Sequence, residues 1–319
     1  MRALRVGRVG GTPEPVEIDE PRPGPGETLL RVAGACLAHV DRSIAAGSLG
    51  GTPPLPYVPC TDGAGWVVAS AVHPAGALVW VRGAGVGVAR VGVAAELAVV
   101  PDDAVHPAPA GADPLLAACF FSPATSAATA LGDLGRLRAG ERVLVTGAAG
   151  AVGSLTVQLA LAAGAEVVGC VRTPARAADV PAGAEVVVGE PGPVEADLLV
   201  DTVGGPGLPG RLAAVRPGGR AVLVGYTAGT AVQLDLPALM RADVALLPLN
   251  MIRRAPAAFA LAGDLLARLT AGELHLAVTA YDLADAATAW ADLTAGRVDG
   301  RAVLVPGGRP GPALSPVPM

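Results

Sequence analysis

The hydrophobic and polar positions divide the chain into two kinds of sequence. Beyond residue 141, short apolar runs alternate with longer helical patterns such as Val152–Ala163. The apolar runs that we interpret as strands are Arg142–Thr146, Glu166–Val171, Ala184–Val188, Asp197–Asp201, Arg220–Gly225 and Asp243–Leu247. Six strands in strand–helix–strand succession predict a parallel six-stranded sheet with helices on both faces, the doubly wound α/β arrangement.

The flanking segments follow a different pattern. Residues 1–118 carry short Val, Leu and Ala runs between turns rich in Pro and Gly, such as PRPGPG at 21–26 and GGTPPLPYVP at 50–59. This pattern favours a small, mostly antiparallel β-barrel or sandwich. Two helical patterns, Ala257–Ala271 and Leu283–Ala295, precede a final strand, Arg301–Pro306, which we expect to return to the first domain. The predicted domains are therefore 1–118 with 256–319, and 119–255.

The most informative segment is the turn after the first strand of the parallel sheet. A strand, a glycine turn and a helix without internal charge follow one another in RVLVTGAAGAVGSLTVQLALA. Glycines let the backbone turn tightly and approach a pyrophosphate, and the helix N-terminus offers free N–H groups to it. A purely structural turn is the alternative, but the strand–turn–helix context favours a dinucleotide loop. Its residues are Gly147, Ala148, Ala149, Gly150, Ala151, Val152 and Gly153.

Composition and charge exclude several classes of partner. The net charge is -5, every basic residue is Arg, and there is no basic run, which argues against a nucleic-acid partner. No apolar stretch approaches the roughly 20 residues that span a bilayer, so no membrane association is expected. The chain starts without a signal-peptide pattern, and its four widely spaced cysteines lack a CxxC motif. We therefore expect a cytoplasmic protein with reduced thiols.

Several ordered motifs along nearly the whole chain resemble one family. They are the opening with PRPGPGE and the Asp at position 41, LPYVPCTDGAGWVV at 55–68, VAAELAVV at 93–100, DLLVDTVGG at 197–205 and GRAVLVP at 300–306. Together they resemble the medium-chain dehydrogenase/reductase superfamily, in its zinc-independent quinone oxidoreductase-like branch, which includes zeta-crystallin-type proteins and enoyl reductases. The resemblance implies a GroES-like catalytic domain, a Rossmann domain, an active site in the cleft between them and a homodimer. It also implies a small-molecule substrate: an enone, an enoyl compound or a quinone.

The segment after the second strand of the parallel sheet indicates the cofactor. NAD enzymes of this fold usually carry an acidic residue there, but the sequence has no carboxylate before Asp179. Arg172, Thr173 and Arg176 match positions that hold a 2′-phosphate in the related quinone reductases, and guanidinium groups bind phosphate bidentately. The prediction is NADPH, with two solvated arginines as the alternative. The remaining cofactor-contact candidates are Thr125, Thr202, Val203, Gly204, Gly225, Tyr226, Thr227, Leu249 and Asn250.

The metal ligands of the zinc-dependent relatives are missing. Those enzymes carry a Cys three residues before the Asp and a His in a GHE motif, whereas this chain has Ala38 and Cys60-Thr61-Asp62 at these places. Without thiolate and imidazole there, no catalytic zinc site of the usual kind is expected. An unusual site of Cys36, His39 and Cys60 is a weaker alternative, because buried Cys usually acts as a small hydrophobe.

The residues that would carry the chemistry also depart from the family. The family's Asn is Ala38 here, and two Tyr positions are Ser43 and Leu49. The catalytic candidates that remain are His39, Asp41, Ser43, Tyr57 and Thr61, each with a structural role as the alternative. We predict an NADPH-dependent reductase that delivers hydride to an activated C=C bond or a quinone, with a tailoring step in a biosynthetic pathway as a further expectation. The alternatives are a cofactor-binding protein with little redox activity, or a non-redox step such as cyclisation or isomerisation.

Overall fold

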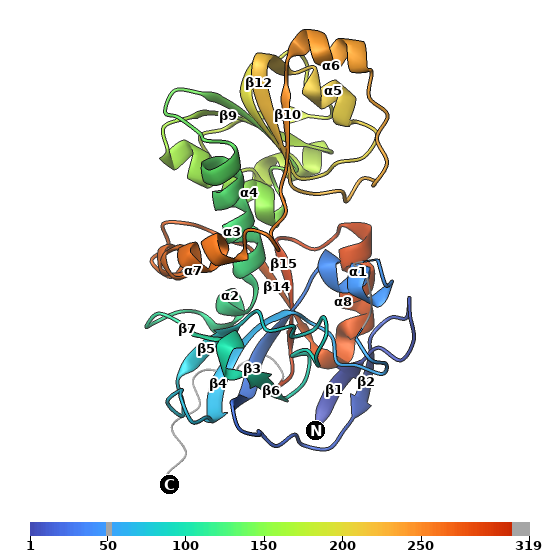
Figure 1. The fold of residues 1–319 in the computed structure, drawn as a ribbon, viewed down its shortest axis with the longest axis vertical. Coiled ribbons are helices and arrows are strands. Elements are labelled where there is room, and N and C mark those ends of the chain that lie inside the picture. Colours follow the sequence, from blue (N-terminus) through green and yellow to red (C-terminus); the bar gives the residue numbers. More distant parts are fainter. Residues whose placement is uncertain (49–52, 308–319) are drawn as a thin grey trace. The chain divides into compact units, whose positions relative to one another are not determined.

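The computed structural model describes residues 1–48 and 53–307, and the chain divides into two compact units (Figure 1). The first unit contains Met1–Phe121 together with the segment from Ala277 onward, and the second is Ser122–Leu276. The chain therefore leaves the first unit, builds the second and returns.

In its described residues, the first unit is a mostly antiparallel β structure with three α-helices. Its elements are β1 (Arg2–Arg5), β2 (Glu14–Glu17), β3 (Glu27–Leu37), α1 (His39–Ala45), β4 (Asp62–Ala69), β5 (Leu78–Val81), β6 (Leu97–Pro101), η1 (Asp102–Ala104), β7 (Val105–Pro107), α2 (Pro114–Cys119), β14 (Val278–Asp282), η4 (Leu283–Asp285), α8 (Ala286–Ala295) and β15 (Arg301–Val305). A seven-stranded sheet runs β14-β15-β3-β4-β5-β7, with β6 also paired to β3, and β1 pairs with β2. The predicted return of the last strand is confirmed, because β15 lies antiparallel to β3.

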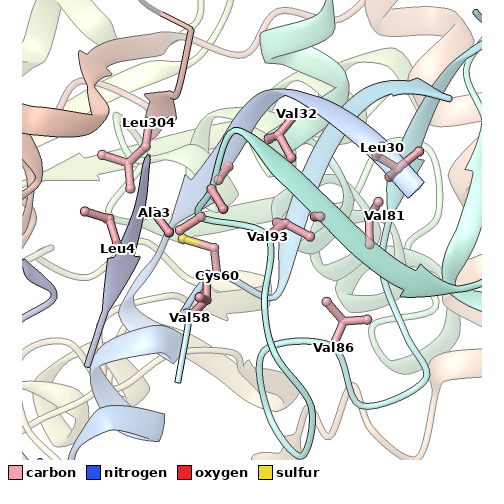
Figure 2. Close-up of a cluster of buried hydrophobic side chains, with 14 of the residues drawn as sticks. Ala3, Leu4, Leu30, Val32, Val58, Cys60, Val81, Val86, Val93 and Leu304 are labelled. Atoms are coloured by element: carbon pink, nitrogen blue, oxygen red, sulfur yellow. The ribbon is translucent and has the colours of Figure 1, made fainter. Parts of the chain in front are cut away.

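The core of this unit gathers small and branched apolar side chains from strands far apart in the sequence. Figure 2 shows part of this cluster, with Ala3, Leu4, Leu30, Val32, Val58, Cys60, Val81, Val86, Val93 and Leu304 labelled. Burying such side chains is the main favourable term in folding. The core therefore holds β1, β3, β15 and the loops around Cys60 as one body.

The second unit contains the parallel sheet. Its elements are α3 (Phe121–Thr129), η2 (Ala130–Leu134), β8 (Arg142–Thr146), α4 (Ala151–Ala162), β9 (Glu166–Val171), η3 (Pro174–Asp179), β10 (Glu185–Val188), β11 (Ala196–Asp201), α5 (Leu208–Leu212), β12 (Val215–Leu223), α6 (Leu236–Ala242), β13 (Ala245–Pro248) and α7 (Ala255–Thr270). The strands run in the order β10-β9-β8-β11-β12-β13, and all neighbours are parallel. This arrangement confirms the predicted doubly wound sheet.

Alternate residues of its strands face two separate cores. Val143 and Val145 of β8 pack on one face with Val157 of α4, whereas Leu144 packs on the other face with Leu208 of α5. This period of two is what a strand buried on both faces requires. Helices therefore cover both faces of the sheet, as the sequence predicts.

The structure differs from the sequence expectation at two places in this unit. The second unit extends to Leu276 rather than to 255, so it includes α7. The side chain of Gln158 in α4 explains this, because it donates to the His275 carbonyl at 2.8 Å and accepts from the His275 N–H at 2.7 Å. In addition, β9 and β10 are connected by the short 3₁₀ helix η3 and not by an α-helix.

Among the described residues, no helix is both long and apolar enough to cross a membrane.

Candidate functional site

The glycine turn after β8 has the geometry of a close-approach loop. Gly147 has φ +61, a left-handed conformation that favours glycine, and a Cβ there would lie 2.6 Å from Thr202 Oγ1. A Cβ on Gly153 would overlap the carbonyl oxygen of Gly147, so α4 packs against the turn without space for a side chain. Gly150 caps α4 with no side-chain hydrogen bond to the helix, which leaves the first N–H groups of α4 open to an anion.

The loops after β11 and β12 close against this turn. The Thr202 hydroxyl donates to the Thr146 carbonyl at 2.6 Å, and the Thr202 N–H donates to Thr146 Oγ1 at 3.0 Å. A Cβ on Gly225 would overlap the carbonyl oxygen of Thr202, and the Ala228 N–H donates to the Val203 carbonyl at 2.8 Å. The carboxyl ends of three neighbouring strands thus meet at one edge, where doubly wound sheets bind nucleotides.

A buried ion pair fixes that edge. Asp201 is 1% exposed; its Oδ1 accepts from Thr146 Oγ1 at 2.7 Å and from Arg211 Nε at 3.0 Å. Its other oxygen accepts from the Gly204 N–H at 2.8 Å, and Arg211 also donates to the Gly204 carbonyl. Asp201 and Arg211 therefore hold the backbone at Gly204 rigidly. Sequence reasoning missed Arg211, because it lies in a helix with no motif.

The basic segment after β9 lies beside the glycine turn. Arg176 donates from Nη2 to the carbonyl of Ala149 at 2.9 Å and forms an ion pair with Asp179 at 3.1 Å. Arg172 and Thr173 are exposed just before it. Two arginines thus follow the strand end at which these folds bind the ribose, and one of them contacts the turn itself.

The other candidates for cofactor contact occupy varied surroundings. Tyr226 is 56% exposed, and Thr227 and Asn250 are exposed as well. Asn250 Oδ1 accepts hydrogen bonds from the N–H groups of residues 252 and 253, which form a turn after β13. Leu249, just before it, is partly buried. Thr125 is fully buried in α3. The loop candidates thus follow the carboxyl ends of the sheet strands, whereas Thr125 is buried in α3.

Three of the catalytic candidates lie on α1 of the first unit. Asp41 is 2% exposed; its Oδ2 accepts from the Ala38 N–H at 2.8 Å, and its Oδ1 is buried without a partner among the described residues. Burial raises the pKa of Asp41 to about 7, although the Ala38 hydrogen bond opposes this shift. His39 is exposed, and desolvation and the Arg42 charge lower its pKa. The Ser43 hydroxyl donates to the His39 carbonyl at 3.3 Å.

Tyr57 packs against the same helix. Its ring contacts Ile44, Ala45 and Val6, and its hydroxyl is buried with no hydrogen-bond partner in the described part of the chain. Burial raises the pKa of Tyr57 to about 12, with a further contribution from the Asp41 charge. Asp41 and Tyr57 thus bring two unsatisfied buried oxygens to the packing of α1, and each such group costs about 1–3 kcal/mol unless a ligand or water satisfies it.

Thr61 is held by an arginine that sequence reasoning did not identify. Arg82 Nη1 donates to Thr61 Oγ1 at 2.7 Å and to Asp62 Oδ2 at 2.9 Å. Its guanidinium carbon lies 5.6 Å from the ring centroid of Phe121, within cation–π range. Thr61 and Asp62 are both buried. The only sequence signal was an Arg immediately after an apolar strand, which by itself identifies no partner.

The side chains at the family's zinc-ligand positions do not suit zinc. Ala38 offers a methyl group and Thr61 a neutral hydroxyl at the positions where zinc-dependent relatives carry their ligands. Within residues 1–48 and 53–307, no group of three or more His, Cys, Asp or Glu side chains could hold a metal ion. Burial raises the pKa values of Cys36, to about 12, and of Cys60, so both thiols stay protonated. Leu49, which replaces a family Tyr, lies outside the described residues.

Comparison with known families and proteins agrees with this geometry. Residues 24–110 match the alcohol dehydrogenase GroES-like domain, and residues 178–304 match the zinc-binding dehydrogenase family. Quinone oxidoreductase of Mus musculus is 35% identical over 175 residues, 53% of this chain and 52% of that protein. Prostaglandin reductase-3 of Bos taurus is 29% identical over 66% of this chain and 58% of that protein. The chain therefore matches about half the length of these curated relatives.

Solved structures resemble the chain over more of its length. The quinone oxidoreductase of Thermus thermophilus, for which a complex with NADPH is also described, superposes with a TM-score of 0.79 at 28% identity. The match covers 96% of this chain and 100% of that one. The match to the zinc-binding dehydrogenase family covers residues 178–304 only, whereas Ala38 and Thr61 lie in the part that matches the GroES-like domain.

Proposed function

This chain belongs to the medium-chain dehydrogenase/reductase superfamily, in its zinc-independent quinone oxidoreductase-like branch, and from this premise we propose that it is an NADPH-dependent reductase of activated C=C bonds or quinones. The observation that carries the proposal is the turn at Gly147 and Gly153, where a side chain on either glycine would strike neighbouring atoms. Such a turn lets a pyrophosphate approach the backbone at the N-terminus of α4.

The residues present fit a nicotinamide dinucleotide. The turn Gly147–Gly153 would hold the pyrophosphate, and the loops at Thr202–Gly204 and Gly225–Thr227 border the same edge of the sheet. When bound, the reduced nicotinamide supplies a hydride. The protein supplies the shape of the edge, which the Asp201–Arg211 ion pair keeps fixed.

Preference for NADPH over NADH rests on Arg172 and Arg176. Charge-assisted hydrogen bonds to a phosphate contribute about 1.5–3 kcal/mol each, which corresponds to roughly 10- to 100-fold in affinity. The Arg176 guanidinium already donates to the Ala149 carbonyl and pairs with Asp179, whereas Arg172 is exposed and closer to the end of β9. We therefore assign the larger part of the 2′-phosphate recognition to Arg172.

The first unit offers hydrogen-bond donation and a proton in place of a metal ion. Arg82 donates to Thr61 Oγ1, and the Thr61 hydroxyl itself donates to Asp62 Oδ2 at 3.4 Å, a long contact from which a better acceptor could take the proton. We propose that Thr61 donates to the substrate carbonyl. Asp41, with a pKa of about 7, can hold a proton near neutral pH, whereas the lowered pKa of His39 leaves its imidazole neutral. Asp41 is therefore the better candidate for the acid.

The test is consumption of the reduced cofactor with a small panel of quinones, enones and unsaturated aldehydes, with NADH as the comparison. Turnover with NADPH on one class would support the proposal and identify the electrophile. Absence of turnover across the panel, with NADPH binding intact, would instead favour a non-redox step or a cofactor-binding role. A homodimer is part of the proposal as well, and light scattering on the full chain tests it.

A further inference from the structure

Arg301 of the first unit forms no ion pair among the described residues, because the carboxylates of Asp41 and Asp62, which interact with its charge, lie beyond ion-pair distance. It opens β15, is half-buried, and donates from Nη2 to the sulfur of Cys36 at 2.9 Å. Its Nε is buried and has no hydrogen-bond partner in residues 1–48 and 53–307. Within the part of the chain that the structure describes, no carboxylate lies within ion-pair distance of it. By contrast, Arg82 and Arg211 each have a carboxylate within about 3 Å.

The Arg301 guanidinium lowers the stability of the folded protein unless an anion binds to it. Guanidinium groups remain protonated in proteins, and a cation partly removed from water with no anion in direct contact is destabilising. The Cys36 thiol does not supply that charge, because burial raises its pKa to about 12. The nearby carboxylates are already bonded elsewhere: Asp62 to Arg82, and Asp41 to the Ala38 N–H.

The sheet register places Arg301 among the catalytic candidates. Ala302 lies opposite Leu37 and Val303 opposite Cys36, so Arg301 comes next to Ala38, where the chain enters α1. Cys36 in turn lies opposite Asp62, which follows Thr61. Arg301, Cys36 and Asp62 thus lie on the adjacent strands β15, β3 and β4, and Thr61 directly precedes β4.

We propose that Arg301 binds the substrate's carbonyl oxygen and stabilises the negative charge that this oxygen acquires during reduction, an inference that rests on the proposed function. Hydride brings two electrons to the β-carbon, the C=C pair moves to form the enolate, and the carbonyl pair comes to reside on oxygen. A proton supplied by Asp41, the acid proposed above, would then add to the α-carbon, and the bound NADPH that supplies the hydride would become NADP⁺. Arg301 acts on the oxyanion and transfers no proton itself.

The kinetic experiment uses Arg301→Gln and Arg301→Lys, with Arg216→Gln as a matched control. Arg216 is an exposed arginine of the second unit that is paired with Asp197. With saturating NADPH, kcat for the best electrophile should fall about 100-fold in Arg301→Gln and less in Arg301→Lys, the range typical of one lost oxyanion donor. The dissociation constant of NADPH should change by less than about threefold. Loss of NADPH affinity with kcat restored at saturation would assign the guanidinium to a cofactor phosphate and overturn the proposal.

A second experiment does not depend on turnover. A nitrophenol is bound to the protein as a mimic of the enolate, and its absorbance is followed as the pH is varied. The absorbance reports the fraction of bound phenol that is ionised to the phenolate. Wild type and Arg216→Gln should lower the apparent pKa of the bound phenol by about one unit or more, and Arg301→Lys should lower it less. Thermal unfolding of each variant checks that it is folded. An unshifted phenol in wild type would overturn the role of Arg301 even if the reductase activity is found, and a shift without any turnover would overturn the proposed reaction alone.

Discussion

Arg176 and Ala149 are joined by a hydrogen bond of 2.9 Å from the guanidinium to the carbonyl, so the basic segment after β9 and the glycine turn form one structure. We expect Arg176→Ala to weaken both NADPH and NADH, because it removes a support of the turn. Arg172→Ala should weaken NADPH by roughly 10-fold or more and leave NADH nearly unchanged. Fluorescence titration of both cofactors measures this, with the exposed Arg241→Ala as control. Equal losses for Arg172→Ala would contradict the phosphate assignment.

Asp179 competes for Arg176. Its carboxylate lies 3.1 Å from Arg176 Nε, and both side chains are partly exposed. Asp179→Asn should therefore release the guanidinium toward a phosphate and tighten NADPH by about two- to fivefold, in keeping with the modest strength of such pairs. The same titration tests it. Unchanged or weaker NADPH binding would show that Asp179 does not limit Arg176.

Gly153 has no space for a methyl group. A Cβ there would overlap the Gly147 carbonyl, so Gly153→Ala should displace α4 from the turn, lower stability by about 1–3 kcal/mol and weaken cofactor binding. Gly263 is the matched control: it lies within α7, where a Cβ would meet no atom within 4 Å apart from the adjacent residues and the nearby helix backbone, and Gly263→Ala should raise the free energy of unfolding by about 0.5–1 kcal/mol. Denaturant unfolding measures both changes. A neutral Gly153→Ala would refute the close packing.

Asp41 makes stability depend on pH. Its pKa is about 7 when folded and about 3.9 in an unfolded chain, so the folded state binds the extra proton between these values and loses stability as pH rises through them. The free energy of unfolding of Asp41→Asn, measured relative to wild type, should therefore rise by roughly 2–4 kcal/mol as the pH goes from 4 to 8. Unfolding free energies across this range measure the difference, with the exposed Asp19→Asn as control. A constant difference would show that Asp41 titrates normally.

Zinc should not copurify in stoichiometric amount. With Ala38 and Thr61 at the ligand positions, the cluster lacks the thiolate and imidazole that bind zinc tightly. Metal analysis after dialysis should find well under one zinc per chain, and a chelator should leave turnover unchanged. Stoichiometric zinc with loss of activity on chelation would contradict the branch assignment.

The sequence predicts the strands of the second unit well because their side-chain alternation is local. Arg142–Thr146 and Glu166–Val171 match β8 and β9 residue for residue. The boundary at 255 was displaced because Gln158 binds the backbone of His275 across 117 residues, a contact with no local signature. The same reason hid Arg82 and Arg301, whose partners Thr61 and Cys36 lie 21 and 265 residues away. His39 stood out by its rarity, but its lowered pKa leaves it mostly unprotonated near neutral pH, so it is a poorer proton source than Asp41.

The return of β15 to the sheet also sets an order of events during synthesis. Cys36 and Arg301 are 265 residues apart, so at typical translation rates roughly 13–50 s pass between the two on the ribosome. During that time all strands of the second unit have been made, while β3 still lacks its neighbour β15. The nascent chain can therefore fold its nucleotide-binding half first. The arginine proposed to act on substrate joins the molecule among its last described residues.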